Sequence, residues 1–114
     1  MRRSVTHPDQ ALPVLDRAHL RRYSGGDAAL EAELFALLES QMGACLAAMK
    51  AADDDEAWRR AAHTLKGASR GVGAMALGEA CARAEDQPRD GQALAQVEKA
   101  AGAVSREIAA LRGG

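Results

Sequence analysis

Aromatic residues, prolines and cysteines are scarce in this sequence, and neither sign of charge dominates. Its 114 residues include one Phe, one Tyr, one Trp, three prolines and two cysteines. The cysteines, Cys45 and Cys81, lie beside apolar residues in helical patterns, so we expect buried free thiols rather than a disulfide, and a cytoplasmic protein. The formal net charge of −1 gives no global basic field, which argues against nucleic acid as a partner.

Long hydrophobic runs are also missing. No apolar stretch approaches the roughly eighteen residues that a membrane span needs, so we expect no membrane partner. The N-terminal run Met1-Arg2-Arg3-Ser4 has no apolar segment behind it and does not have the pattern of a secretory signal. A glycine-rich nucleotide loop of the P-loop type is absent. We therefore expect no ATP site and no cofactor, and we do not expect an enzyme that acts on its own.

The residues that are abundant favour helix almost throughout. Alanine, leucine, glutamate and arginine dominate, and 47% of the residues are hydrophobic. The sequence predicts an all-α fold, an antiparallel up-down four-helix bundle with a short extra N-terminal helix. Residues 1–14 are predicted to be a flexible tail and residues 15–112 the bundle domain. Helices are expected over residues 17–23, 28–52, 54–71, 74–86 and 90–112.

The strongest amphipathic pattern lies in the helix predicted over residues 28–52, where apolar residues recur every three or four positions. They are Leu30, Leu34, Leu37, Leu38, Met42, Cys45, Leu46 and Met49. In the short first helix, Leu20 and Tyr23 are spaced to lie on the bundle. In the last helix the core-facing set is expected to extend to Leu111.

Two aspartates are placed to cap helices, and an acidic run lies at the start of a third helix. Asp16 precedes the short helix, Asp27 follows the break at residues 24–26, and Asp54 lies in the acidic run of residues 53–56. A metal site is an alternative for that acidic run. However, carboxylates at a helix N-terminus are stabilised by the positive end of the helix dipole. We therefore interpret the run as a helix start and expect no metal.

The helix predicted over residues 54–71 has two contrasting faces. At about 100° per residue, one broad side is apolar apart from a serine, which is typical of a helix packed on a core. This side holds Trp58, Ala61, Ala62, Leu65, Ala68, Ser69 and Val72. The opposite side holds Arg59, Arg60, His63, Lys66, Gly67 and Arg70. His63 lies about 160° from the middle of the apolar stripe and should face water.

A glycine and several cations surround His63. Gly67 lies one turn later, where a side chain would otherwise stand beside the imidazole, although glycine inside a helix costs roughly 1 kcal/mol relative to alanine. Its place predicts that another surface comes close to His63. Arg59, Lys66 and Arg70 favour the neutral, nucleophilic ring and also an anion attached to it. The combination is suited to a phosphoryl group that is received and passed on.

The sequence around His63 resembles the histidine-containing phosphotransfer (HPt) domain family in two runs, Ala62-His63-Thr64-Leu65-Lys66-Gly67-Ala68-Ser69 and Val72-Gly73-Ala74. The pattern of that family is His-x-x-Lys-Gly with a second glycine six residues later. The resemblance implies a four-helix bundle whose exposed histidine carries phosphate. It also implies that Nε2 of His63 accepts the phosphate, that Lys66 balances its charge, and that Gly67 leaves room for the partner's active site.

One position departs from the family. Its members often carry a glutamine on the neighbouring helix that hydrogen-bonds the phosphohistidine site. Counted without gaps from His63, this chain has Glu85 at that place, and Gln87 would need a shift in alignment. Because a carboxylate would repel a phosphate, we do not assign that role to Glu85.

The resemblance predicts a phosphorelay protein that accepts a phosphoryl group on His63 from a receiver-domain aspartate or a kinase and passes it to a response-regulator aspartate. Its partners would be receiver domains of response regulators or hybrid histidine kinases, which would supply the divalent metal and the aspartate. We expect Arg59, Arg60, Arg70 and Gly71 to contact such a partner, and the protein to be a monomer. The alternative is a helical module that docks on a receiver without carrying phosphate.

Overall fold

Five helices follow one another along residues 12–113, the part of the chain that this computed structural model describes. They are α2 (Arg17–Ser24), α3 (Ala28–Ala51), α4 (Asp55–Val72), α5 (Met75–Glu85) and α6 (Gly91–Gly113). No strand occurs among the described residues, which confirms the all-α prediction, and every helix end lies within one residue of its predicted place.

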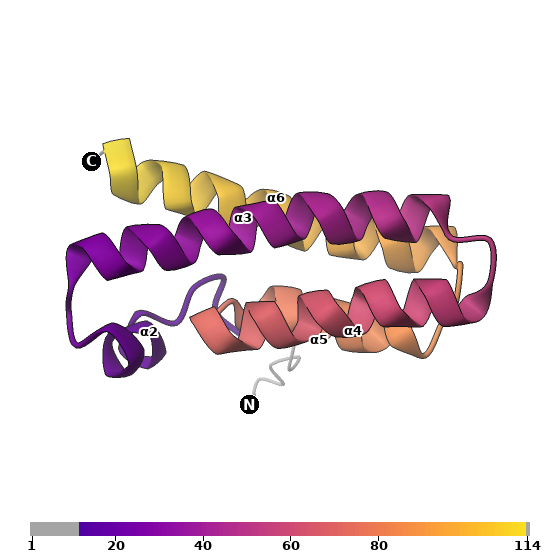
Figure 1. Ribbon diagram of the computed structural model, residues 1–114, viewed down its shortest axis with the longest axis horizontal. Coiled ribbons are helices and arrows are strands. Elements are labelled where there is room, and N and C mark those ends of the chain that lie inside the picture. The colour runs from indigo at the N-terminus through magenta and orange to yellow at the C-terminus, as the bar shows by residue number, and fades with distance from the viewer. Residues whose placement is uncertain (1–11, 114) are drawn as a thin grey trace, which may run out of the picture.

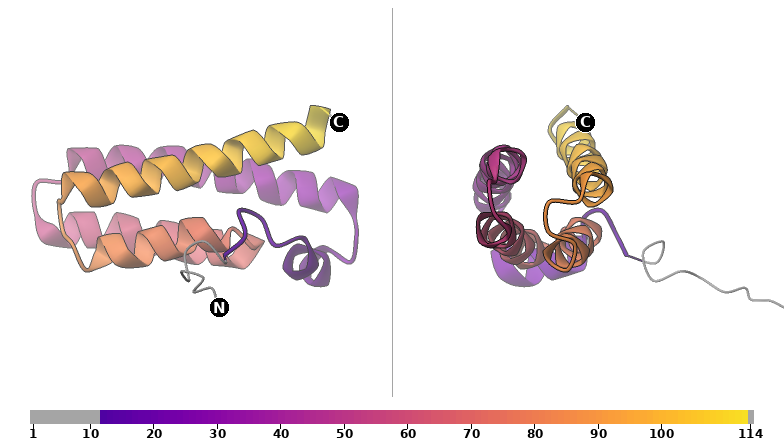
Figure 2. Two further views of the ribbon diagram at one scale, coloured as in Figure 1. Left: turned by 180° about the vertical axis from the view of Figure 1, so that it is seen from behind. Right: turned by 90° about the vertical axis from the view of Figure 1, so that its right-hand side faces the viewer.

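Helices α3, α4, α5 and α6 run alternately up and down and form the predicted four-helix bundle (Figure 1). Around the bundle, α3 contacts α4, α4 contacts α5, α5 contacts α6, and α6 closes the ring on α3. The end-on view shows the four helices at the corners of a common core (Figure 2). The short helix α2 lies across the end of the bundle where α4 ends, and it contacts α3.

Both predicted N-caps, Asp16 and Asp27, are present, and Asp54, predicted as the first residue of its helix, is the N-cap of α4. Each aspartate side chain accepts a hydrogen bond from the backbone N–H three residues later, which satisfies a donor that has no partner inside the helix. The pairs are Asp16 with His19 at 3.0 Å, Asp27 with Leu30 at 3.1 Å and Asp54 with Ala57 at 2.8 Å. The acidic run before α4 therefore begins a helix, as the sequence analysis predicts.

A glycine turn joins α4 to α5 and ties down the segment before α2. Gly73 has φ +95°, and a Cβ added there would lie 2.9 Å from the backbone oxygen of Asp16, so a side chain is excluded on both grounds. The Asp16 N–H donates to the Gly73 carbonyl at 2.8 Å, and the Ala76 N–H donates to the Pro13 carbonyl at 3.1 Å. The predicted tail of residues 1–14 falls largely on residues 1–11, which lie outside the described residues.

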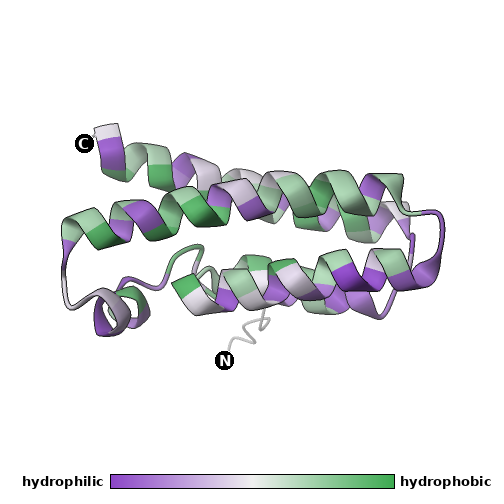
Figure 3. Cartoon of the chain, viewed as in Figure 1, coloured by the Kyte–Doolittle hydropathy of each residue, from purple (hydrophilic) through white to green (hydrophobic). Residues whose placement is uncertain are grey.

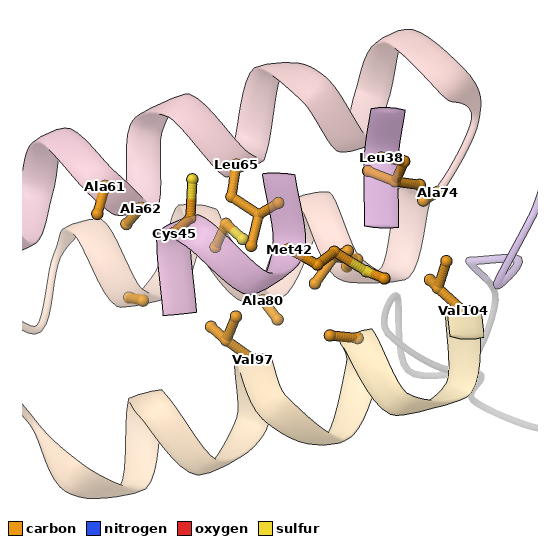
Figure 4. Packing of buried hydrophobic residues seen from close by; sticks show 14 of the residues in the cluster. Leu38, Met42, Cys45, Ala61, Ala62, Leu65, Ala74, Ala80, Val97 and Val104 are labelled. Carbon is orange, nitrogen blue, oxygen red and sulfur yellow. The ribbon is translucent and has the colours of Figure 1, made fainter. Parts of the chain in front are cut away.

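The core is a single cluster with contributions from all five helices. Figure 4 shows its middle, where Leu65 of α4 faces Met42 and Cys45 of α3 and Val97 of α6. Trp58 is buried, and its indole N–H donates to the Ala84 carbonyl at 2.7 Å. This bond joins α4 to the last turn of α5.

Three apolar residues that the periodicity assigned to the bundle are exposed instead. Tyr23 is 66% exposed, Leu37 63% and Leu111 39%. The reason for Tyr23 is that α2 turns only Leu20 and Ser24 fully inward. In α3 the apolar residues cover a wider arc than the bundle can bury, and Figure 3 shows apolar residues over much of its visible surface. Leu37 therefore lies on the flank of α3, in a groove with Ala68 and Val72 of α4.

The wide apolar arc of α3 has a second, unexpected consequence. By length and mean hydropathy alone, Ala28–Ala51 would be long enough and apolar enough to cross a membrane. The core helix of a bundle meets the same criterion, and α3 buries Phe35, Leu38, Met42, Cys45 and Met49 against the other helices. Of its most apolar eighteen-residue window, 28% is buried inside the bundle.

Candidate functional site

His63 lies in the middle of α4, opposite the residues that pack into the bundle. Its side chain is 69% exposed, whereas Trp58, Leu65 and Ser69 of the same helix are buried. The prediction that this ring faces water is confirmed. The amphipathic pattern of α4 accounts for it, because burying the apolar stripe leaves the opposite side in solvent.

The exposed ring contacts a carboxylate of the neighbouring helix. Nδ1 of His63 lies 3.2 Å from Oε2 of Glu85 in the last turn of α5, and Nζ of Lys66 lies 2.5 Å from Oε1 of the same carboxylate. Glu85 thus links two residues that lie three apart on α4. Glu85, which its charge made an unexpected member of the site, therefore lies at it. Gln87, the other candidate, lines a groove between α5 and α6.

The Glu85 carboxylate is held in its ionised form. Burial raises the pKa of Glu85, but the hydrogen bonds and charges of Lys66 and His63 outweigh burial, and the pKa lies below its ordinary value. An ionised carboxylate can only accept hydrogen bonds. Nδ1 of His63 must therefore carry the ring proton and donate it to Glu85.

This tautomer leaves the other ring nitrogen as a nucleophile. In a neutral imidazole with its proton on Nδ1, Nε2 has a free lone pair. Nε2 is also the nitrogen farther from the backbone, and no hydrogen bond to it occurs within the described residues. The carboxylate does not lie where the phosphoryl group would bind. Glu85 contacts the Nδ1 edge of the ring, and an incoming phosphoryl group would approach Nε2 on the opposite edge.

The bundle positions Glu85 through the residue before it. The Ala84 carbonyl accepts the buried indole N–H of Trp58, which fixes the end of α5 against α4. A second ion pair joins the two helices, because Glu79, nearly two turns earlier on α5, lies 3.7 Å from Arg70 of α4. The count from His63 puts Glu85 at the position of the family's glutamine, but the sequence does not show that its carboxylate reaches the ring, nor which ring nitrogen it faces.

Two glycines leave the surface of α4 open beside His63. A Cβ added at Gly67 or at Gly71 would meet nothing within 4 Å. Neither position is therefore required to be glycine by contacts within this chain. Glycine costs roughly 1 kcal/mol relative to alanine inside a helix. The open space at both positions therefore supports the prediction that a partner protein approaches α4 there.

The ring of cations predicted around His63 is partly neutralised. Lys66 is paired with Glu85, and Arg70 lies 3.7 Å from Glu79 of α5. Arg60, a predicted partner contact, lies 3.5 Å from Glu56 on its own helix. Lys66 thus orients the carboxylate that orients the ring, and it does not stand free to meet a phosphate as the resemblance implied. Among the predicted partner-binding cations, Arg59 has no ion pair within the described residues.

Other chemistry-bearing side chains do not form a competing centre. The hydroxyl of Ser69 is buried and donates to the Leu65 carbonyl at 2.7 Å. Burial raises the pKa of Cys81 to about 12 and also raises that of Cys45, and both cysteines are free thiols. No group of three or more His, Cys, Asp or Glu side chains in residues 12–113 is arranged to hold a metal ion.

Comparison with known proteins gives two matches. The sequence model of the Hpt domain matches residues 28–114. Among solved structures, the histidine phosphotransferase ShpA from Caulobacter crescentus is similar at 35% sequence identity and a TM-score of 0.72, with 89% of this chain and 92% of that chain covered. No match was found among curated proteins.

Proposed function

Because the chain belongs to the Hpt domain family of phosphorelay proteins, we propose that His63 is the residue that carries the phosphoryl group, on Nε2. The observation that supports this assignment best is the contact between Nδ1 and Glu85 at 3.2 Å. It holds the ring in the tautomer whose free nitrogen faces solvent. Gly67, one turn away, leaves space for the active site that must approach it.

The chemical step is a displacement at phosphorus. The Nε2 lone pair attacks the phosphorus of an aspartyl phosphate, the bond from phosphorus to the aspartate oxygen breaks, and the carboxylate leaves. The ring then carries a positive charge with its proton still on Nδ1. Glu85 stabilises that charge, and Lys66 holds Glu85 in place. In the reverse direction, the protonated ring is the leaving group for transfer to the next aspartate.

The partner supplies the rest of the reaction. Receiver domains are the partners that the family implies. We propose that the receiver brings the aspartate and the divalent metal, so that this chain has no ATP site and serves as a carrier. We also propose a cytoplasmic monomer that binds neither nucleic acid nor membrane. Arg59, Arg60, Arg70 and Gly71 are proposed to contact the receiver around His63.

A labelling experiment tests the proposal. A receiver domain phosphorylated in the presence of Mg²⁺ is mixed with the wild-type protein and with His63→Gln. The wild type should take label that is lost in acid and kept in base, and His63→Gln should take none. His19→Gln, which removes the other described histidine, is the matched control and should be labelled. Equal labelling of the wild type and His63→Gln would reject the assignment.

A further inference from the structure

A shallow pocket lies between α2 and α4, two turns along α4 from His63. It is lined by His19, Arg22, Tyr23, Arg70 and Gly71. Arg70 follows His63 by seven residues, so it lies about 10 Å further along the axis and on nearly the same side of the helix. Gly67 lies between them and Gly71 directly follows Arg70, and a Cβ added at either glycine would meet nothing within 4 Å. A partner that covers His63 can therefore extend over the glycines into the pocket.

The pocket is basic, and no carboxylate is among the described residues that line it. Within the described chain, the guanidinium of Arg22 has one hydrogen bond, to Nδ1 of His19 at 3.5 Å, and no ion pair. Arg70 shares the carboxylate of Glu79 with Arg83, at 3.7 Å from each. The helix Arg17–Ser24 contains three arginines and no acidic residue. Guanidinium groups with incomplete pairing favour a carboxylate or another oxyanion.

The structure holds the walls of this pocket in place. The Gly71 carbonyl can only accept, so Nε2 of His19 donates to it at 3.3 Å, and Nδ1 is left to accept from Arg22. The stem of Arg70 lies across α5 at Gly78, where an added Cβ would come within 2.8 Å of Cγ.

At the rim, two thirds of Tyr23 is exposed, and burial in its own bundle does not account for this aromatic ring. Aromatic and arginine side chains dominate the binding energy of many protein interfaces.

We propose that this pocket is a second recognition point for the receiver domain and takes an acidic side chain on the receiver surface about 10 Å from its phosphorylated aspartate. The inference rests on the proposed function, since it extends the surface around His63. An interface of ordinary size covers about 800 Å² on each partner, a patch roughly 30 Å across, which reaches from His63 to α2. The positive charge of the pocket selects an acidic surface, and its distance from His63 lets it select among receivers without entering the reaction.

The test compares two arginines of the same helix. The probe is the receiver domain of the source organism that transfers phosphate fastest to the wild-type protein. Arg22→Gln should raise the KM for that receiver about fivefold, with little change in kcat, because Arg22 lines the pocket. Arg21→Gln removes the same charge, but Arg21 is not among the residues that line the pocket, and the KM should stay within about twofold. Circular dichroism checks that both variants keep their helices.

Each other outcome overturns the inference. Equal increases in KM for the two variants would mean general electrostatic attraction rather than a pocket, and no increase for Arg22→Gln would mean no contact there. A change in the oligomeric state of Arg22→Gln without a change in KM would assign the pocket to a second copy of this chain. If no receiver transfers phosphate to the wild type, the proposed function itself is refuted, and this inference with it.

Discussion

Replacing Glu85 by glutamine should slow phosphorylation of His63 without abolishing it. The carboxylate contacts Nδ1 at 3.2 Å, and its charge matters most when the ring becomes positive in the transition state. A hydrogen bond to a charged group contributes roughly 1.5–3 kcal/mol to stability. Because the ring of His63 is 69% exposed, solvent screening should reduce the loss to about 1 kcal/mol, which corresponds to a rate about fivefold lower.

The assay uses a small phosphodonor, such as phosphoramidate, so that the rate reports on the ring of His63 and not on receiver binding. The mass of the intact protein follows the reaction. Glu79→Gln is the matched control, since Glu79 lies on the same helix and pairs with arginines but not with His63. It should react at the wild-type rate. If Glu85→Gln also reacts at the wild-type rate, the reasoning about the stabilisation of the ring charge by Glu85 is refuted.

The difference in stability between the wild type and Glu85→Gln should depend on pH. The pKa of Glu85 is lowered in the folded protein, so the folded state favours the ionised form. Its contribution to the free energy of unfolding is therefore present above the unfolded-state pKa and is lost as the pH falls through the lowered value. Urea unfolding should show the wild type as more stable than Glu85→Gln at pH 7, with a difference that disappears on acidification. A difference that stays constant with pH would contradict the ion pair.

Three further predictions follow from other parts of the fold. Gly67→Gln should slow transfer from a receiver with unchanged helicity, whereas Gly43→Gln, on the far flank of α3, should not; equal rates for both would contradict the clearance argument. Trp58→Phe removes the indole donor from the Ala84 carbonyl, which still accepts from the Gln87 N–H, and should lower the free energy of unfolding by about 0.5–1.5 kcal/mol in urea; an unchanged midpoint would argue against a contribution from that bond. Cys45 and Cys81 should resist iodoacetamide at neutral pH until urea unfolds the protein, and rapid alkylation of the folded chain would contradict their burial.

The helices could be predicted because their signals are local. The apolar stripe of α4, the aspartate caps and the glycine at position 73 each act within a few residues of the place they determine. His63 could be placed on the exposed side for the same reason. Its ring is held away from the core by its own helix, without help from distant residues.

The partners of His63 could not be predicted in the same way. Whether Glu85 reaches Nδ1 depends on how α5 packs against α4, which Trp58 and the Ala84 carbonyl determine across 26 positions of sequence. The same limit applies to Tyr23. Its spacing is that of a buried residue, but α2 lies across the end of the bundle, and this orientation depends on tertiary contacts.

The most direct measurement is nuclear magnetic resonance of the phosphorylated protein with ¹⁵N-labelled histidine. It reports which ring nitrogen of His63 is bonded to phosphorus and which carries the proton. The structure predicts phosphorus on Nε2 and a proton on Nδ1, still hydrogen-bonded to Glu85. Phosphorus on Nδ1, or a phosphorylated protein in which His63 is unmodified, would contradict the account.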